Sequence, residues 1–198
     1  MLQIERIEPE KRSGYEVELS DGTCWHLYKS DLRRYGLEVG KELSEAEREE
    51  IYRICVTVRA RKKILAMLER MDRTEQDLRH RLTRAGYPEE AVDDAIAYAK
   101  KFGYINDERY ARSYARSRSR TKSRRQIEAE LSQKGITGKK IEELFEDALP
   151  EEEAIRKQIR KKTADVESLD LAKKQKLALS LYRKGFPQDL IRKELKLY

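Results

Sequence analysis

The sequence predicts a mainly α-helical protein: three tandem three-helix repeats in a curved array, preceded by a small β-hairpin module. Three observations support this fold class. Five apolar positions recur three times, 49 and 50 residues apart, around Gly86, Gly135 and Gly185. Charged residues make up 41% of the chain and hydrophobic residues 38%, which suits thin helical layers with narrow apolar stripes. Alternation of polar and apolar residues, the period of a β-strand, is found near the N-terminus.

These observations divide the 198 residues into five parts. Residues 1–43 form a small β-rich N-terminal module, and residues 44–60 form a connecting helix. Residues 61–106 form the first helical repeat, residues 107–150 a second and basic repeat, and residues 151–198 the third.

The N-terminal module is predicted from a hairpin signal. Tyr15–Leu19 alternates polar and apolar residues, and Asp21-Gly22 is typical of a two-residue type I′ turn. That turn places Val17 opposite His26. The connecting helix begins at a capping box, Ser44-Glu-Ala-Glu47, in which a hydroxyl and a carboxylate each satisfy a free backbone amide.

Each repeat is predicted to contain a helix–glycine–helix hairpin. The glycine ends a helix through a positive φ angle, and Pro88, Thr137 and Pro187 then start the next helix, as a proline at the first helical position or a capping threonine would. The apolar positions that agree in all three copies are Leu78, Ile127 and Leu177; Leu82, Leu131 and Leu181; Tyr87, Ile136 and Phe186; Val92, Ile141 and Ile191; Ile96, Phe145 and Leu195.

Catalysis is not supported by any motif. The chain has no glycine-rich phosphate loop, no GxSxG or HExxH motif, and no Cys/His cluster. We therefore expect a protein that is not an enzyme and that uses no cofactor and no metal.

The compartment is predicted from the N-terminus and the cysteines. Met1–Glu8 lacks the apolar core of a signal peptide, and no run of 18 apolar residues predicts a membrane span. Cys24 and Cys55 form no metal-spaced pair and are interpreted as reduced thiols. We expect a cytoplasmic protein.

The positive charge of the chain is concentrated in one segment. Between Arg109 and Arg125 there are eight basic residues and no acidic one; without these eight, 36 basic residues face 37 acidic ones. Helical phasing of residues 107–120 puts Tyr110 and Tyr114 on one face with two alanines. The opposite face carries Arg109, Arg112, Arg116 and Arg120, whereas Arg118 departs from this row, which suggests that the helix ends near it. The tyrosine face is interpreted as core, with base stacking as the alternative.

The basic residues of this segment are the candidate binding residues, because such a patch attracts phosphate or an acidic protein surface. A merely solvated charged face is the alternative interpretation. Six phosphate contacts would give a log affinity–log salt slope of about −5. The candidate residues are Arg109, Arg112, Arg116, Arg120, Lys122, Arg124 and Arg125.

Two stretches resemble a known family. Phe102-Gly-Tyr-Ile-Asn-Asp-Glu-Arg-Tyr-Ala111, with Arg116, and Arg125-Gln-Ile-Glu-Ala-Glu-Leu-Ser-Gln-Lys-Gly-Ile136 closely resemble the central motif of the RecX regulatory proteins. The resemblance extends over residues 60–198, and the N-terminal module resembles the extension of RecX proteins of Gram-positive type. A glycine common in one loop of the family is replaced here by Thr121-Lys122-Ser123.

The resemblance implies a regulator in recombination, DNA repair and the SOS response. It implies a monomer that binds the RecA filament on single-stranded DNA, inhibits its ATPase, strand exchange and co-protease activities, and binds single-stranded DNA weakly without sequence specificity. No membrane partner is expected.

Two other functions stay open from the sequence. A general nucleic-acid-binding protein of helix-turn-helix type would present a recognition helix rich in Arg, Asn or Gln. Two of the three candidate helices instead open with acidic residues, as in Pro88-Glu-Glu90. A purely structural helical adaptor is the third interpretation.

Overall fold

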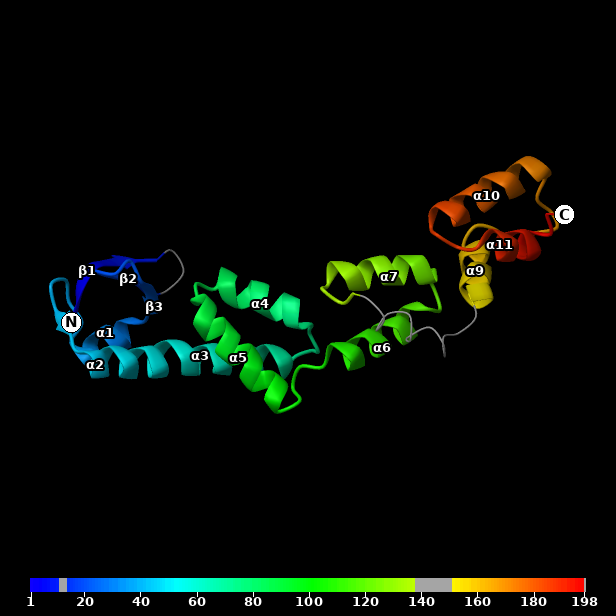
Figure 1. The fold of residues 1–198 in the computed structure, drawn as a ribbon. Coiled ribbons are helices and arrows are strands. Elements are labelled where there is room, and N and C mark those ends of the chain that lie inside the picture. The colour runs from blue at the N-terminus through cyan, green and yellow to red at the C-terminus, as the bar shows by residue number, and fades with distance from the viewer. Residues whose placement is uncertain (11–13, 138–150, 198) are drawn as a thin grey trace. The chain divides into compact units, whose positions relative to one another are not determined.

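The chain folds into two compact units. The computed structural model describes residues 1–10, 14–137 and 151–197. Internal contacts divide the chain into Met1–Asn106 and Asp107–Tyr198. Figure 1 shows strands and helices in the first unit, and only helices labelled in the second.

An antiparallel sheet forms the N-terminal module. Its strand order is β3-β2-β1-β4, and the pairs β1–β2, β2–β3 and β1–β4 are antiparallel. The short helix α1, Lys29–Tyr35, follows β3 and ends at Gly36, whose φ of 56° lies in the left-handed region. The strands are β1 (Leu2–Pro9), β2 (Tyr15–Leu19), β3 (Cys24–Leu27) and β4 (Glu42–Leu43).

The predicted register of the β2–β3 hairpin is wrong by one residue. Val17 pairs with Trp25, not with His26. The Leu19 amide donates to the Thr23 carbonyl (2.9 Å), which leaves a three-residue loop with Gly22 at φ 80°. A loop of this kind follows a type I turn with a left-handed glycine, whereas a two-residue turn needs positive φ at both positions. The observed register buries Val17 and Trp25 together.

A continuous helical segment joins the sheet to the first repeat. It comprises α2 (Glu45–Ile51), a π-helical turn η1 (Tyr52–Thr57) and α3 (Val58–Leu68). The predicted capping box is present, since the Ser44 hydroxyl accepts from the Glu47 amide and the Glu47 carboxylate accepts from the Ser44 amide.

The first repeat consists of α3 and two further helices, α4 (Glu75–Arg84) and α5 (Glu89–Lys101). Its buried residues belong to the same apolar cluster as those of the sheet, so Trp25 and Leu82 are parts of one core. The β module and the first repeat are therefore one folded body.

Among its described residues, the second unit has two apolar clusters, one in each repeat. In the second repeat the structure describes α6 (Asp107–Arg118) and α7 (Arg124–Gln133); the third helix predicted after Thr137 lies outside the described residues. The third repeat consists of α9 (Glu151–Arg160), α10 (Leu171–Arg183) and α11 (Gln188–Leu195).

The repeat glycines have the predicted geometry. Gly86, Gly135 and Gly185 have φ angles of 83°, 83° and 81°. Pro88 and Pro187 are N-cap residues of α5 and α11, one position earlier than the first helical position predicted for them. Among the residues described, none of the helices has the length and apolar content needed to cross a membrane.

Candidate functional site

The tyrosine and arginine faces of α6 are separated as the sequence predicts. Ala111 and Ala115 are 1% and 6% exposed and belong to the core of the second repeat. Arg112 and Arg116 are exposed on the other side of the helix. The helix thus presents a row of arginines to solvent.

The structure changes the place of Arg120. Helical phasing predicts it on the arginine face, but α6 ends at Arg118. The amides of Thr121 and Lys122 both donate to the Arg118 carbonyl at 2.9 Å, so the chain turns here. Arg120 is exposed in that turn, between the helical arginines and the start of α7.

Several candidate residues are already paired within the chain. Arg112 contacts Glu108 at 2.8 Å, in an exposed pair one helical turn apart. Arg124 contacts Glu128 at 2.7 Å. Arg109 also has an interaction partner within the chain.

Lys122 is the most enclosed of the paired candidates. Its Nζ contacts the Glu130 carboxylate, which also accepts a hydrogen bond from the Tyr114 hydroxyl at 2.6 Å. Burial alone raises the pKa of Glu130, but the hydrogen bonds from Lys122 and Tyr114 outweigh it and hold the pKa below its usual value. This lysine therefore stabilises the joint between α6 and α7.

Three candidates keep an unneutralised charge. Within the described residues, Arg116, Arg120 and Arg125 make no salt bridge, and all three are exposed. A surface cation without an internal partner can bind an external anion without first breaking an ion pair within the protein. We call these three residues the open arginines.

The tyrosines have a structural role. Tyr110 and Tyr114 stack on each other with ring centroids 6.0 Å apart, and both pack on the core of the repeat. Arg118 lies over the Tyr114 ring at 5.5 Å, and Lys134 lies near both rings. Their faces are covered by protein groups, which supports the core interpretation over base stacking.

The N-terminus of α7 holds an internal anion. The Arg124 amide donates to a Glu151 carboxylate oxygen at 2.8 Å. Burial raises the pKa of Glu151, against the effect of this hydrogen bond. A carboxylate beside the positive end of the helix dipole is favourable, so part of the need for an outside anion at this terminus is met within the unit.

Polar contacts around Ser123 link the second and third repeats. The Ser123 hydroxyl accepts from the Gln126 amide and donates to the Lys184 carbonyl at 2.5 Å. The Gln158 side chain donates to the Thr121 carbonyl at 2.6 Å. The segment from Thr121 to Arg125 is therefore both a joint between repeats and part of the basic surface.

Two of the acidic partners of this segment, Glu130 and Glu151, were not predicted from the sequence. The Arg124–Glu128 pair has the i,i+4 spacing that could have revealed it. The Lys122–Glu130 and Glu151 contacts depend on the turn and on another repeat, and no local pattern signals them. The part of the chain that the structure describes contains no cluster of His, Cys, Asp and Glu residues able to hold a metal ion.

Comparison with known proteins identifies the family. Models of the first, second and third three-helix domains of RecX match residues 60–98, 106–144 and 150–195. A regulatory protein RecX from Caldanaerobacter subterraneus is 30% identical over the full length of both chains. The chain belongs to the RecX family.

Other RecX proteins agree with this assignment. One from Listeria monocytogenes is 27% identical over 93% of this chain and 70% of its own length. A crystal structure of a regulatory protein RecX superposes with a TM-score of 0.64 at 28% identity, covering 99% of each chain. RecX from Lactobacillus salivarius gives a TM-score of 0.61 at 27% identity, over 72% of this chain and 97% of its own. The mainly helical fold with three-helix repeats and an N-terminal strand module is confirmed, and the family is one of regulatory proteins.

Proposed function

We propose that this RecX-family chain is a non-catalytic regulator of recombination and DNA repair that binds the RecA filament on single-stranded DNA. In this proposal it inhibits the ATPase, strand-exchange and co-protease activities of the filament, and it acts as a monomer in the cytoplasm. Membership of a regulatory family supports the role. The observation that carries the binding proposal is the exposed basic surface of the second repeat, with its three open arginines.

The repeats would lie along the filament groove and bridge neighbouring RecA protomers. Bridging opposes the changes between protomers that ATP turnover and strand pairing require. Arg116, Arg120 and Arg125 would meet acidic RecA surface or DNA phosphate directly. Arg112 would join them readily, because an exposed pair such as Arg112–Glu108 contributes only about 0.3–0.5 kcal/mol and exchanges easily.

The helix-turn-helix alternative is less well supported. A recognition helix approaches DNA with its N-terminal residues. The first turn of α5 contains Glu89 and Glu90, and that of α11 contains Asp189. These carboxylates oppose the approach of phosphate at both described candidates. A footprint on one defined duplex sequence would favour this alternative instead.

The proposal is tested by titrating the protein into RecA of the same organism, single-stranded DNA and ATP, and by following ATP hydrolysis. We expect inhibition at fewer than one regulator per RecA, since one bridging molecule affects more than one protomer. Unchanged hydrolysis together with no binding to the assembled filament would refute the proposal.

A further inference from the structure

Two neighbouring aromatic side chains are exposed at the C-terminal end of α5. Phe102 is 55% exposed and Tyr104 is 47% exposed, and their ring centroids lie 6.3 Å apart at an interplanar angle of 34°. Phe102 also contacts the partly buried ring of Tyr98, with centroids 4.8 Å apart. We call Phe102 and Tyr104 the exposed ring pair. Both residues belong to the first unit, whereas the basic surface described above belongs to the second.

The turn after α5 explains why these rings lie outside the core. Gly103 ends the helix with a φ of 71°, its amide donates to the Lys100 carbonyl at 3.0 Å, and the Tyr104 amide donates to the Ala99 carbonyl at 2.9 Å. These two hydrogen bonds form a Schellman motif. Ala99 and Ile105 are 0% and 6% exposed and belong to the core of the first unit. Because these two residues anchor the turn, the ring pair is not needed to fill the core.

The exposed ring pair lies beside cationic groups. Residues 95–106 contain two lysines and no acidic residue. Lys100 contacts Glu75 at 2.8 Å, whereas Lys101 makes no salt bridge with any other described residue, and its Nζ lies 6.0 Å from the centroid of the Phe102 ring. Lysines in the last turn of a helix are favourable at the negative end of its dipole. The dipole does not account for two exposed rings beside them.

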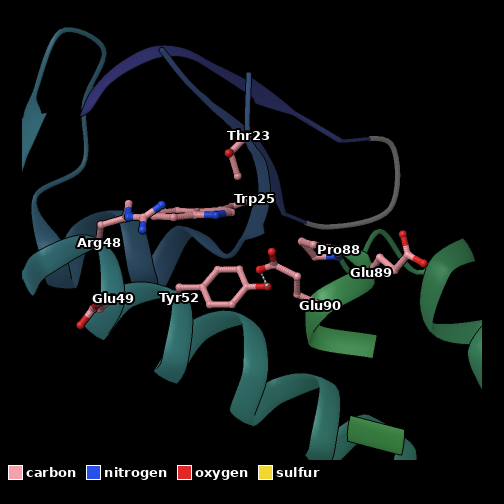
Figure 2. Close-up of a pocket in the computed structure, with 8 residues that line it drawn as sticks. All are labelled: Thr23, Trp25, Arg48, Glu49, Tyr52, Pro88, Glu89 and Glu90. Atoms are coloured by element: carbon pink, nitrogen blue, oxygen red, sulfur yellow. Dashed lines mark hydrogen bonds between the residues drawn. The ribbon is translucent and has the colours of Figure 1, made fainter. Parts of the chain in front are cut away.

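The opposite end of α5 has aromatic residues of a different kind. Figure 2 shows a hollow of about 440 Å³ there, lined by Trp25, Tyr52 and Glu90 among others. Trp25 is only 2% exposed, and the Tyr52 hydroxyl already donates to the Glu90 carboxylate at 3.3 Å. These groups are used within the fold, so a ligand that stacks on aromatic rings finds a more open surface at the exposed ring pair.

Exposed rings beside an unpaired lysine fit single-stranded nucleic acid. Every unpaired base has a π face that stacks on an aromatic side chain, and nearby cations attract the phosphates of the strand. A duplex keeps these faces within its own stack. A protein partner would cover the rings with apolar side chains, and Lys101 would then lose water without gaining an anion. The charge beside the rings therefore favours a nucleic-acid strand over an apolar protein surface.

We propose that the exposed ring pair stacks on bases of single-stranded DNA, with Lys101 beside an adjoining phosphate. This site is separate from the open arginines, whose proposed contacts are with phosphate or acidic protein groups. The inference shares with the proposed function only the choice of single-stranded DNA as the ligand. Its first test omits RecA, so that the two proposals can fail separately.

The test compares two labelled probes of equal length and equal charge. One is an oligo(dT) of about 15 nucleotides, and the other is an abasic strand of the same length, which keeps every phosphate and has no base. The full-length protein is titrated into each probe, and fluorescence anisotropy is followed. Wild type should bind oligo(dT) at least about tenfold more tightly than the abasic strand, because only oligo(dT) can stack on the rings.

A double variant assigns this preference to the ring pair. Phe102→Leu/Tyr104→Leu removes both rings but keeps apolar side chains and every charge. Its affinity for oligo(dT) should fall at least about tenfold. Its affinity for the abasic strand and its slope of log affinity against log salt should stay unchanged, because no cation is lost. The matched control Tyr182→Leu removes a ring that is 59% exposed in the third repeat and should bind both probes as wild type does.

A single variant provides a direct readout of stacking that does not depend on the double variant. Phe102→Trp keeps an aromatic ring at the exposed position and should keep the affinity for oligo(dT). Oligo(dT) should quench the emission of the new indole, and the abasic strand should not. Trp25 is the single tryptophan of the natural chain and is buried, so it contributes a constant background.

The proposal is overturned by equal affinity of wild type for the two probes, by no binding of oligo(dT), or by wild-type affinity of the double variant for oligo(dT). Emission of Phe102→Trp that does not change at saturation also overturns it. If the double variant binds oligo(dT) normally but binds the RecA–DNA filament more weakly, the exposed ring pair contacts RecA protein and not bases. In each of these cases the proposed inhibition of the filament is still decided by its own ATP-hydrolysis assay.

Discussion

Removal of the arginine row is the most direct test of the basic surface. Within residues 1–10, 14–137 and 151–197, the variant Arg112→Ala/Arg116→Ala/Arg120→Ala loses one ion pair, the exposed Arg112–Glu108 contact. Such pairs contribute about 0.3–0.5 kcal/mol, and alanine at the two helical positions returns a few tenths of a kcal/mol through its higher helix propensity. The free energy of unfolding should therefore change by less than about 0.5 kcal/mol, and Tm by less than about 2 °C.

The loss of binding should be much larger than the loss of stability. Each phosphate contact on a single strand contributes about −0.7 to the slope of log affinity against log salt. When the salt concentration falls from 1 M to 0.1 M, this slope raises the affinity about fivefold for each contact and about 100-fold for three contacts. The variant without the three arginines should lose this gain. The magnitude of the slope should fall by about 2 if all three arginines meet phosphate. Contact with acidic RecA residues instead would weaken filament binding and leave the affinity for bare single-stranded DNA nearly unchanged.

Fluorescence anisotropy with labelled single-stranded DNA, with and without assembled RecA, measures both quantities. The matched control is Lys157→Ala/Lys161→Ala/Lys176→Ala, which removes three exposed cations from the third repeat. Both variants lower the formal net charge from +7 to +4, since each loses three positive charges. The reasoning is refuted if the arginine variant binds the filament as tightly as wild type, or if both variants lose affinity equally.

Two further predictions concern stability. Burial alone raises the pKa of Asp31, but hydrogen bonds from Arg59 and the Tyr28 amide outweigh burial and lower this pKa. Because the pKa of Asp31 is lower in the folded than in the unfolded state, its ionised carboxylate stabilises the fold above about pH 4. This stabilisation is lost as the pH falls through the folded pKa. In urea, the free energy of unfolding of Asp31→Asn should be lower than that of wild type by about 2–4 kcal/mol at pH 7, and this difference should shrink at low pH. A difference that stays the same at all pH values would contradict the prediction. Gly185→Ala should destabilise the second unit by at least about 1 kcal/mol, because φ is 81° and the new Cβ would lie 3.0 Å from Arg125 Cβ; wild-type thermal unfolding would contradict it.

The sequence was sufficient for features that recur or that are local. The repeat alignment correctly placed Leu82, Leu131 and Leu181 in cores, since each is at most 1% exposed. Helical phasing separated the buried alanines of α6 from its arginines, because the rotation of about 100° per residue fixes which face of the helix each residue occupies. The capping box at Ser44 is likewise contained within four residues.

Features that depend on the path of the chain were missed. The dipeptide Asp21-Gly22 fits either a two-residue or a three-residue loop, and the choice is made by burial of Trp25 opposite Val17. Glu130 neutralises Lys122 only because the chain turns after Arg118. A count of charges along the sequence carries no information about this turn. The absence of acidic residues between Arg109 and Arg125 therefore led to too high an estimate of the number of cations available to a partner.

The π-helical turn at Tyr52–Thr57 has a consequence for how the family can vary. An α-helix advances by about 100° per residue, so the wider turn acts as one residue inserted into an otherwise regular helix. Upstream of it, Ile51 is buried in the core; downstream, Ile64 is buried in the same core. Deletion of a single residue within the turn would rotate one of these faces by about 100° relative to the other. The loss or gain of one codon in this stretch would thus reset the angle between sheet and repeat, whereas length changes in the loops outside the helix would leave it intact.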